Sequence, residues 1–359
     1  MILPKPRKID VERYIGGLSK IKKIDNPIKL SANESALGPS PKALKAFERD
    51  KDKIFKYPES DSNFLRNVIA KSLKIDEERI ICGSGSDQIF DLVCRLFIEP
   101  GDEVIVTEFG FIMHRIYASL YQAKVMLAKE ENFKASVDEI LKKVSNKTKI
   151  VFIANPNNPT GTYISKNSML DLRKRLRSDI LLVVDDAYFE FLNKEDYVSG
   201  LELFKNSENV LITRTFSKIY GLAGLRLGWA YSSKKIINSM YQIKPPFNVN
   251  RVALAAGVEA IQDNEWTQKA IEYNTLWSKK IFSVLQGYKI KTNEPTANFF
   301  LMNFDQTKIN SDKVFEELSN KRLILREMKQ YKIPNALRLT IGDEQANEHF
   351  IKSIGKILK

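Results

Sequence analysis

The chain has 359 residues, and its 43% hydrophobic and 28% charged residues are those of an ordinary globular protein. No apolar stretch is long enough to span a bilayer, and the N-terminus lacks the apolar core of a signal peptide. Two cysteines, Cys82 and Cys94, provide neither a disulfide framework nor a metal cluster, so we expect no metal site and a reducing, cytoplasmic compartment. The length predicts two domains of unequal size.

The formal net charge of +13 leaves nucleic-acid binding as an alternative function. Against it, lysines such as Lys45 and Lys51 lie on predicted helical surfaces with Glu48 and Asp50 between them, and no zinc-finger, helix-turn-helix or RNP motif accompanies them. A lysine-rich surface that attracts small anionic substrates is the milder explanation. We therefore expect no nucleic-acid partner.

The N-terminal part of the chain is expected to begin with an arm, residues 1–30, that joins the small domain and has a short amphipathic segment over 9–18. Ser40 followed by Pro41 is typical of a helix N-cap and the first helical residue. Residues 80–87 then give an apolar run, a Gly/Ser loop and a helix start. This pattern favours either an anion site or a plain capped helix.

Continuous aliphatic runs then alternate with helical periodicity up to about residue 245. Such runs, separated by helices, are typical of a parallel sheet covered on both faces. We therefore predict an α/β fold for residues 31–245, with three αβα layers and a mostly parallel sheet that forms the large domain. The expected strands are 104–106, 150–153, 181–184 and 210–212, and the expected helices are 111–121 and 168–176.

The pattern changes after residue 245, where a Pro-rich break precedes a long helical region over 252–285. Shorter strands are expected at 299–302 and 337–341, and a final helix at 347–358. Residues 246–359 therefore predict a long connecting helix and a small α+β C-terminal domain.

A lysine stands where the strand 210–212 meets a Gly-rich turn, at Lys218. Lysine amines bind carbonyl compounds and pyridoxal phosphate covalently. Thr215, Ser217 and Arg226 surround it in sequence, and two hydroxyls with a guanidinium are suited to a phosphate. A solvated lysine beside an ordinary turn is the alternative for the lysine alone.

Two more polar groups follow strand ends. Asp185 ends a buried strand, where an unpaired carboxylate is costly and calls for a cation, either a protonated pyridine nitrogen or a structural Arg or Lys. Asn158 lies in a stiff loop with two prolines and suits either a phenolic oxygen or a structural turn. Ligands of such sheets sit at the carboxyl ends of the strands, so we expect these residues to meet Lys218 there.

The motifs, in this order, resemble those of fold type I pyridoxal-phosphate-dependent aminotransferases. They are the Asn-Pro-Thr-Gly loop at 158–161, Asp-Asp-Ala-Tyr at 185–188, and Ser-Lys with Gly-x-x-Gly-x-Arg-x-Gly over 217–228. The resemblance covers nearly the whole chain and is closest to the histidinol-phosphate aminotransferase branch. Asp186 stands where that branch usually has Glu, which leaves the cofactor chemistry in place.

The resemblance implies pyridoxal 5′-phosphate as cofactor. Lys218 would bind it covalently and move the proton during transfer, and Asp185 would face the ring nitrogen. Asn158 and Tyr188 would contact the ring hydroxyl. The catalytic residues that the resemblance implies are Lys218, Asp185 and Tyr188. The positions implied to hold the phosphate are Gly85, Ser86, Thr215, Ser217 and Arg226, and Asp87 is a further implied cofactor-binding position.

Two aromatic residues complete the implied cofactor site: Phe109 would stack on the ring, and Tyr57 would reach the phosphate in the other subunit of a homodimer with shared sites. The implied substrate-binding residues are Arg338, for a carboxylate, Arg326 and Tyr14, near a distal phosphate, and Asn33. For Arg326 and Arg338 the alternative is a solvated surface position.

The function implied is that of an aminotransferase (EC 2.6.1 class) of histidine biosynthesis. It would convert L-histidinol phosphate and 2-oxoglutarate to 3-(imidazol-4-yl)-2-oxopropyl phosphate and L-glutamate. Alternatives on the same scaffold are an aminotransferase for aromatic amino acids or another small amino phosphate, and a decarboxylase of phosphorylated amino acids. A pyridoxal-phosphate-binding regulator is disfavoured because no DNA-binding segment is found.

Overall fold

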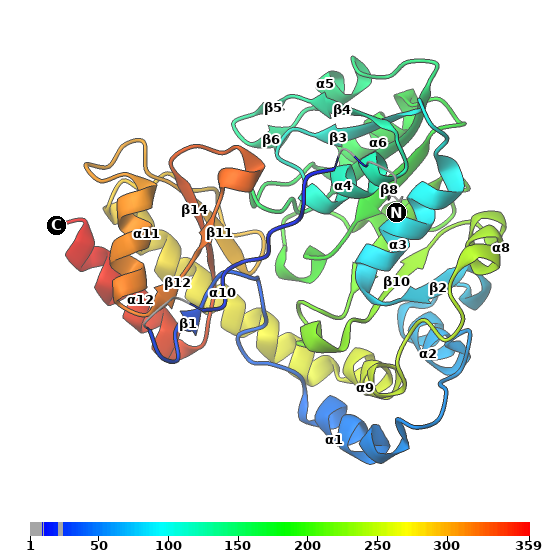
Figure 1. Cartoon of the computed structure of the whole chain (residues 1–359), viewed down its shortest axis with the longest axis horizontal. Coiled ribbons are helices and arrows are strands. Elements are labelled where there is room, and N and C mark those ends of the chain that lie inside the picture. Colours follow the sequence, from blue (N-terminus) through cyan, green and yellow to red (C-terminus); the bar gives the residue numbers. More distant parts are fainter. Residues whose placement is uncertain (1–8, 10, 21–23) are drawn as a thin grey trace, which may run out of the picture.

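The predicted aliphatic strands form one seven-stranded sheet in the computed structural model, which describes residues 9, 11–20 and 24–359 (Figure 1). All neighbouring strands are parallel except β10, which is antiparallel to both β2 and β9. This confirms the predicted α/β fold with a mostly parallel sheet. In spatial order the strands are β2 (Ile80–Gly83), β10 (Gly228–Tyr231), β9 (Val210–Thr215), β8 (Leu181–Asp185), β7 (Thr148–Ala154), β3 (Glu103–Thr107) and β4 (Lys124–Ala128).

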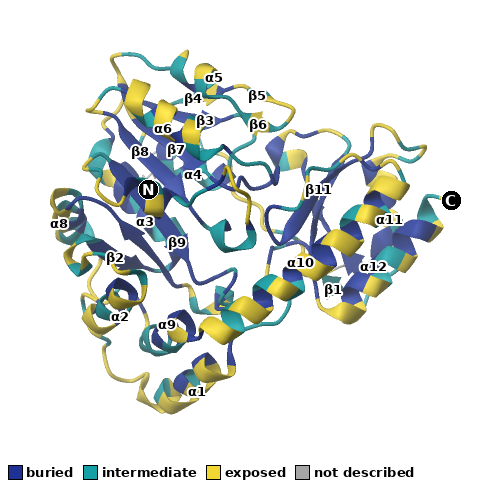
Figure 2. Cartoon of the chain, turned by 180° about the vertical axis from the view of Figure 1, so that it is seen from behind, coloured by how far each residue is buried: buried dark blue, intermediate teal, exposed yellow. Residues whose placement is uncertain are grey.

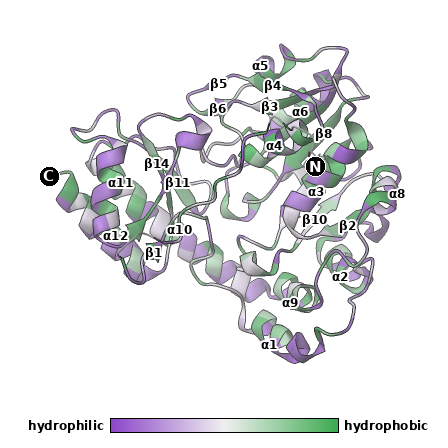
Figure 3. Ribbon diagram, viewed as in Figure 1, coloured by the Kyte–Doolittle hydropathy of each residue, from purple (hydrophilic) through white to green (hydrophobic). Residues whose placement is uncertain are grey.

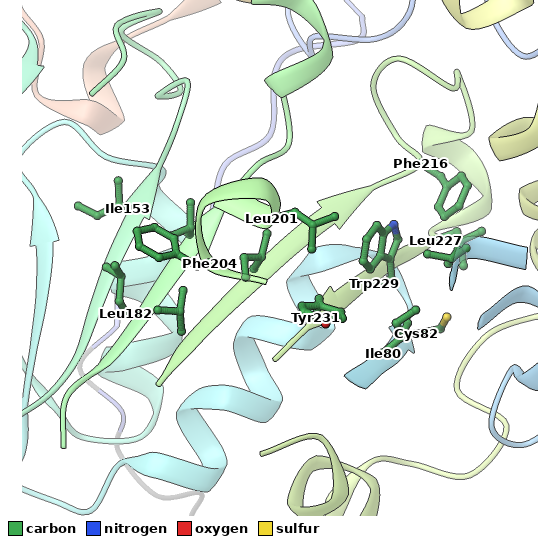
Figure 4. Packing of buried hydrophobic residues seen from close by; sticks show 14 of the residues in the cluster. Ile80, Cys82, Ile153, Leu182, Leu201, Phe204, Phe216, Leu227, Trp229 and Tyr231 are labelled. Carbon is green, nitrogen blue, oxygen red and sulfur yellow. The ribbon is translucent and has the colours of Figure 1, made fainter. Parts of the chain in front are cut away.

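Helices cover both faces of the sheet because successive strand side chains point to opposite sides. Along β8, Leu182 and Val184 join one apolar core (Figure 4), whereas Leu181 and Val183 join the other. Figure 2 shows buried strands between helices whose outer sides are exposed. The first core includes residues of α1 (Pro41–Asp50), α2 (Asn63–Leu73), α5 (Val137–Leu141), α6 (Lys166–Arg175), α7 (Gly200–Phe204) and α9 (Arg251–Gln262). The second includes residues of α3 (Gly85–Phe97), α4 (Ile112–Leu120) and α8 (Lys234–Ile243).

A smaller unit packs beside the sheet around a separate core that includes Trp277, Phe300 and Phe350. Its antiparallel sheet has the order β11 (Phe299–Asn303), β14 (Ala336–Thr340) and β13 (Arg326–Glu327), and β1 (Ile28–Lys29) pairs with β12 (Leu323–Ile324). Its helices are α10 (Asn264–Gly287), α11 (Ser311–Asn320) and α12 (Glu344–Ile357), and Figure 3 shows their mixed polar and apolar sides. A short hairpin of β5 (Glu130–Glu131) and β6 (Lys134–Ala135) belongs to the large unit.

The long helical region expected over 252–285 is present, but it forms two helices that break at Asp263 instead of one continuous helix. The Asp263 carboxylate is buried and lies 3.2 Å from Lys42 Nζ, so the break places a charged group against α1. Because α9 packs against α1 and α2, it adds to the large core. The domain boundaries near residues 30 and 245 stay predictions.

The amphipathic segment expected over 9–18 has no helix or strand in its described part, residues 9 and 11–18, and residue 10 lies outside the description. In Figure 1 this stretch runs from the small unit across to α4. Within the described residues, no helix is both long and apolar enough to cross a membrane.

Candidate active site

The predicted site residues converge on one cavity of about 510 Å³ at the carboxyl ends of β8 and β9. Its size is that of a small-molecule pocket. The cavity lies between the large sheet and the small unit, since both units supply lining side chains. The predicted residues that line it are Tyr14, Asn33, Ser86, Asp87, Asn158, Asp185, Tyr188, Thr215, Ser217, Lys218, Arg226, Arg326 and Arg338.

The Lys218 amine projects from the turn after β9 into this cavity. It donates to the Ala32 carbonyl at 3.4 Å and lies 5.6 Å from the centre of the Tyr188 ring. No carboxylate of the described residues forms an ion pair with it. Burial, reinforced by the Arg338 charge, lowers the pKa of Lys218 to about 8. The amine is therefore available as a nucleophile and proton carrier near neutral pH.

Asp185 faces the same cavity from the end of β8. Its Oδ1 accepts a hydrogen bond from Thr213 Oγ1 at 3.0 Å, and its Oδ2 lies 3.6 Å from His114 Nε2. The His114 ring is buried and stacks on Phe152 with ring centres 4.8 Å apart. These contacts fix the orientation of a carboxylate that is only 4% exposed.

A cradle suited to a phosphate forms where α3 begins beside the Arg226 guanidinium. Arg226 donates to Ser217 Oγ at 3.2 Å and to Asp87 Oδ2 at 3.0 Å. A Cβ on Gly85 would lie 2.4 Å from Arg226 Nη2, and Gly85 has a φ of +75°. Only glycine allows this approach, so Gly85 supports the cradle without lining the cavity. Burial raises the pKa of Asp87, and the Arg226 charge opposes that shift.

Hydrogen bonds link the remaining polar groups of the cavity wall across the two units. Tyr188 Oη accepts from Asn33 Nδ2 at 2.9 Å, and Asn158 Oδ1 accepts from Arg338 Nη1. Burial raises the pKa of Tyr188 to about 12, so the phenol keeps its proton. Asn33 itself has a φ of 53° and is held by Thr340, whose Oγ1 accepts from the Asn33 N–H at 2.9 Å.

Two arginines of the small unit lie side by side, because Arg326 on β13 is the register partner of Arg338 on β14. They are 7% and 5% exposed, and neither forms an ion pair with a carboxylate of the described residues. Arg338 donates to the Ser31 carbonyl at 2.9 Å, and Arg326 donates to the Ile15 carbonyl. Burial lowers the pKa of Arg338. A pair of buried cations without counter-charges is suited to binding an anion.

Phe109, predicted to stack on the cofactor ring, lies outside the cavity lining. Its ring packs against Phe133 at 5.4 Å. The reason is the turn after β3, in which the Gly110 N–H bonds to the Thr107 carbonyl and directs Phe111 into the cavity instead.

Tyr57 also lies outside the cavity of its own chain. It is 78% exposed and stacks on Phe247 with ring centres 4.6 Å apart. Its expected contact with a partner subunit stays a prediction.

Sequence reasoning missed several residues of α4 and of the small unit. Phe111, Met113 and Tyr117 line the cavity, and His114 faces Asp185. The spacing of three between 111, 114 and 117 places these residues on one helix face, which is a signal that was present. Tyr331 lines the cavity from the small unit, and nothing in its local sequence indicated this.

These groups fit the cofactor that the motifs imply. Within the described residues, His114 Nε2 makes no hydrogen bond, and Asp185 accepts a hydrogen bond only at Oδ1. Asp185 Oδ2 is therefore available to accept from a protonated pyridine nitrogen. Lys218 forms no ion pair with a carboxylate of the described residues, and the cradle beside Gly85 holds Arg226 for a phosphate. The donor set therefore suits pyridoxal phosphate at all three of its polar ends.

Comparison with known protein families matches residues 25–354 to "Aminotransferase class I and II". The chain belongs to this family. Its relatives include the "Histidinol-phosphate aminotransferase" of Pelagibacter ubique, 52% identical over 99% of both chains, and that of Maricaulis maris, 40% identical over 100% of this chain and 99% of the relative. The predicted family, α/β fold and transaminase class are thereby confirmed.

Solved structures share the fold at lower identity. The histidinol-phosphate aminotransferase of Sinorhizobium meliloti, solved with pyridoxal-5′-phosphate, has a TM-score of 0.86 at 21% identity and covers 92% of this chain and 90% of its own. An aspartate aminotransferase of Thermotoga maritima scores 0.82 at 21% identity over 93% and 92%. Two enzymes named for different substrates therefore share this fold, and the fold alone does not select a substrate. The cofactor of the family is pyridoxal phosphate.

Proposed function

We propose that this chain is a histidinol-phosphate aminotransferase, which moves an amino group from L-histidinol phosphate to 2-oxoglutarate. The observation that carries the proposal is the buried pair Arg326 and Arg338 in the same cavity as Lys218. Both substrates have an anionic end, and a paired guanidinium site binds phosphate or carboxylate through several donors at once. The similarity to the Pelagibacter ubique protein supports the same substrate.

The cofactor would be held at three points by residues of the large sheet. Pyridoxal phosphate, when bound, supplies the aldehyde that carries the amino group and a ring that withdraws electrons from the reacting carbon. Asp185 would keep the ring nitrogen protonated, and Arg226 with Ser217 would hold the phosphate. Phe111, Asn158 and Tyr188 line the cavity; Phe111 would stack on the ring, and Asn158 and Tyr188 would contact its hydroxyl.

Lys218 would perform the proton transfer. Its Nζ atom would accept a proton from the α-carbon of the bound substrate and would donate that proton again within the same cavity. Burial lowers the pKa of this amine to about 8, which matches a base that works near neutral pH. Water is limited here, because Tyr188 and Asn158 are nearly fully buried around it.

A half-reaction screen tests the substrate. The cofactor-loaded enzyme is mixed with L-histidinol phosphate, L-phenylalanine, L-aspartate or L-glutamate, and conversion of the aldehyde form of the cofactor to its amine form is followed by absorbance. We expect L-histidinol phosphate and L-glutamate to react fastest. Fast reaction with L-phenylalanine alone would favour an aromatic aminotransferase. Release of carbon dioxide from a phosphorylated amino acid added to the same screen would favour a decarboxylase.

We also propose a homodimer that buries the surface around Tyr57. Ile54, Phe55, Tyr57 and Phe64 are each between 66% and 79% exposed, and Phe247 is 41% exposed beneath Tyr57. A patch of this kind on one face is typical of a protein interface. Charge at its edge comes from Arg251, which donates to the Tyr57 carbonyl at 2.8 Å.

A subunit-mixing experiment tests the shared site. Lys218→Ala and Tyr57→Ala proteins are each expected to be nearly inactive, the second through loss of a phosphate contact from the partner. Their mixture should regain up to about a quarter of wild-type activity, since one site of a hybrid dimer has both residues intact. A mixture as inactive as its parts, in a protein that elutes as a dimer, would show that Tyr57 does not act across the interface.

The compartment is proposed to be the cytoplasm. Cys82 and Cys94 are buried and free, as expected in a reducing environment.

A further inference from the structure

The side-chain amide of Gln330, which is half-buried outside the cavity, holds the N-terminal segment that contacts Arg326. We call residues 11–18 the strap. Gln330 Oε1 accepts from the Ile15 N–H at 3.2 Å, and Gln330 Nε2 donates to the Arg13 carbonyl at 2.8 Å. The side-chain amide thus satisfies a main-chain donor and acceptor two residues apart, as a neighbouring strand would. A side-chain amide offers a donor and an acceptor next to each other, as this contact requires.

The strap reaches the substrate end of the cavity directly. Arg326 donates to the Ile15 carbonyl, and its guanidinium lies 5.8 Å from the centre of the Tyr14 ring. Tyr14 and Gly17 line the cavity, and Val11 packs against the cluster that contains Tyr331. The position of the strap therefore decides where Tyr14 and the Arg326 guanidinium stand.

The second half of the strap is tied to the other arginine. Ser31 Oγ donates to the Leu18 carbonyl at 2.8 Å, while the Ser31 carbonyl accepts from Arg338 at 2.9 Å. A Cβ on Gly17 would lie 2.7 Å from the Ser31 carbonyl oxygen, so strap and Ser31 are in close contact. Both arginines of the anion site thus bind main-chain oxygens that belong to the strap or touch it.

Gln330 is itself anchored to the large unit. Arg115 on α4 donates to the Gln330 carbonyl at 2.9 Å and lies 3.3 Å from the Glu12 carboxylate of the segment that follows residue 10. The same helix carries Met113 and Tyr117 into the cavity. The connection therefore runs from the large unit through Gln330 to the strap, across the seam between the two units.

We propose that Gln330 is a positioning residue for substrate recognition: it latches the strap so that Tyr14 and Arg326 form the distal anion site. The inference rests on the proposed function for the identity of that anion. It deepens that function, because Gln330 would act on substrate recognition indirectly, by fixing the positions of Tyr14 and Arg326.

Three variants of the full-length, cofactor-loaded enzyme test the latch. Gln330→Leu removes both hydrogen bonds, and Gln330→Glu keeps the acceptor but loses the donor. The control is Gln268→Leu, the same substitution at an exposed glutamine on α10 that bonds only to Glu272 at 2.9 Å. Each protein is measured by hydrogen exchange of a peptide that contains the Ile15 amide, and by KM and kcat for L-histidinol phosphate.

The expected result for Gln330→Leu is exchange of the strap peptide faster by about tenfold and a KM higher by about tenfold, with kcat within twofold. The reason is that both hydrogen bonds to the strap are lost, and a tenfold change corresponds to about 1.4 kcal/mol. Gln330→Glu should show a raised KM as well, because the Arg13 carbonyl loses its donor. A merely structural role would lower the melting temperature without separating KM from kcat.

Two results would overturn the latch: strap exchange in Gln330→Leu equal to that in Gln268→Leu, or faster exchange with an unchanged KM. Strap exchange and KM in Gln330→Glu equal to those of the wild type would show that the Nε2 donor of Gln330 is not needed. If the wild-type enzyme fails to convert L-histidinol phosphate, the proposed function fails, while the exchange measurement still reports on the latch.

Discussion

The two ends of the cavity are built differently. At the cofactor end, Asp185 and Thr215 are the last residues of neighbouring parallel strands. Thr213 on β9 donates to Asp185, and the Ser217 N–H in the turn after β9 donates to Thr215 Oγ1. At the distal end, Arg326 and Arg338 pair with no carboxylate of the described residues and bind main-chain oxygens of residues 15 and 31. One end is set by a rigid sheet and the other is assembled from segments far apart in sequence.

This difference indicates that the sheet end serves the chemical step and that the distal end serves substrate selection. A buried carboxylate fixed by strand geometry suits a group that must stay in place through every cycle. Buried cations satisfied only by carbonyl oxygens retain most of their attraction for a phosphate or carboxylate. We therefore expect substitutions at the sheet end to lower kcat or cofactor affinity, and substitutions at the distal end to raise KM.

The largest effect is expected for Asp185→Asn. The amide keeps the acceptor for Thr213 Oγ1 but removes the charge that would hold the ring-nitrogen proton. We expect kcat to fall by about 10²- to 10³-fold, as for loss of one preorganised charged group. Single-turnover absorbance measures this, with thermal unfolding as the control for folding. A variant that turns over at the wild-type rate would contradict the assigned role of Asp185.

Gly85→Ala should weaken cofactor binding rather than the chemical step. The added Cβ would lie 2.4 Å from Arg226 Nη2 at a residue with a φ of +75°, so the guanidinium must leave the cradle. We expect the Kd for pyridoxal phosphate to rise at least about tenfold, because strain and a lost charged hydrogen bond each cost about 1–3 kcal/mol.

The matched control for Gly85→Ala is Gly287→Ala, where an added Cβ meets nothing within 4 Å. Equilibrium dialysis or fluorescence titration gives both affinities. Equal affinities in the two variants would show that the Arg226 cradle does not bind the phosphate.

The distal arginines provide the next comparison. Arg326→Met and Arg338→Met each remove a charged donor from the anion site while keeping much of the apolar stem. We expect KM for L-histidinol phosphate to rise about 30-fold in each, as a charged hydrogen bond contributes about 1.5–3 kcal/mol. The Kd for the cofactor should change less than threefold. A larger change in the cofactor Kd than in KM would contradict the assignment of these arginines to substrate binding.

The smallest effect on activity is expected for Glu130→Gln, which instead changes the pH dependence of stability. Burial raises the pKa of Glu130 to about 7, although a bond from Thr107 opposes the shift. In the unfolded chain the group has its ordinary pKa of 4.5, so the folded state loses stability as pH rises from about 4.5 to 7. Above pH 7 the loss levels off at about 3 kcal/mol.

Glu130→Gln has no charge to bury, so its melting temperature should exceed that of the wild type at pH 8 and approach it near pH 4.5. Glu131→Gln, at the exposed neighbouring residue, controls for the loss of one charge. A melting-temperature difference that does not change between pH 4.5 and 8 would mean that Glu130 titrates normally.

The cofactor end was predictable from the sequence because the carboxyl ends of parallel strands meet at one edge. Asp185, Thr215 and Lys218 each follow an aliphatic run, and the structure brings all three to one cavity. The choice between Phe109 and Phe111 was not predictable, since it depends on the turn between Thr107 and Gly110. A two-residue shift along such a turn sends a ring to the other side of the loop.

The distal end was only partly predictable. Arg326, Arg338 and Tyr14 were expected near the substrate, and they line the cavity. The contacts that hold them join residues about 300 positions apart, such as Gln330 with Arg13, and side-chain bonds to main-chain atoms leave no periodic signal in a sequence. His114 was missed although its spacing from Phe111 and Tyr117 places it on the same helix face, because that spacing does not show which residue the ring faces.

The most direct test of this account is chemical. The loaded enzyme is treated with sodium borohydride, which fixes the aldehyde carbon of the cofactor to the amine that holds it, and the modified peptide is then identified by mass spectrometry. We predict one modified residue, Lys218, and loss of both the modification and the visible absorbance band in Lys218→Ala. Modification at another lysine, or an unchanged band in that variant, would contradict the account.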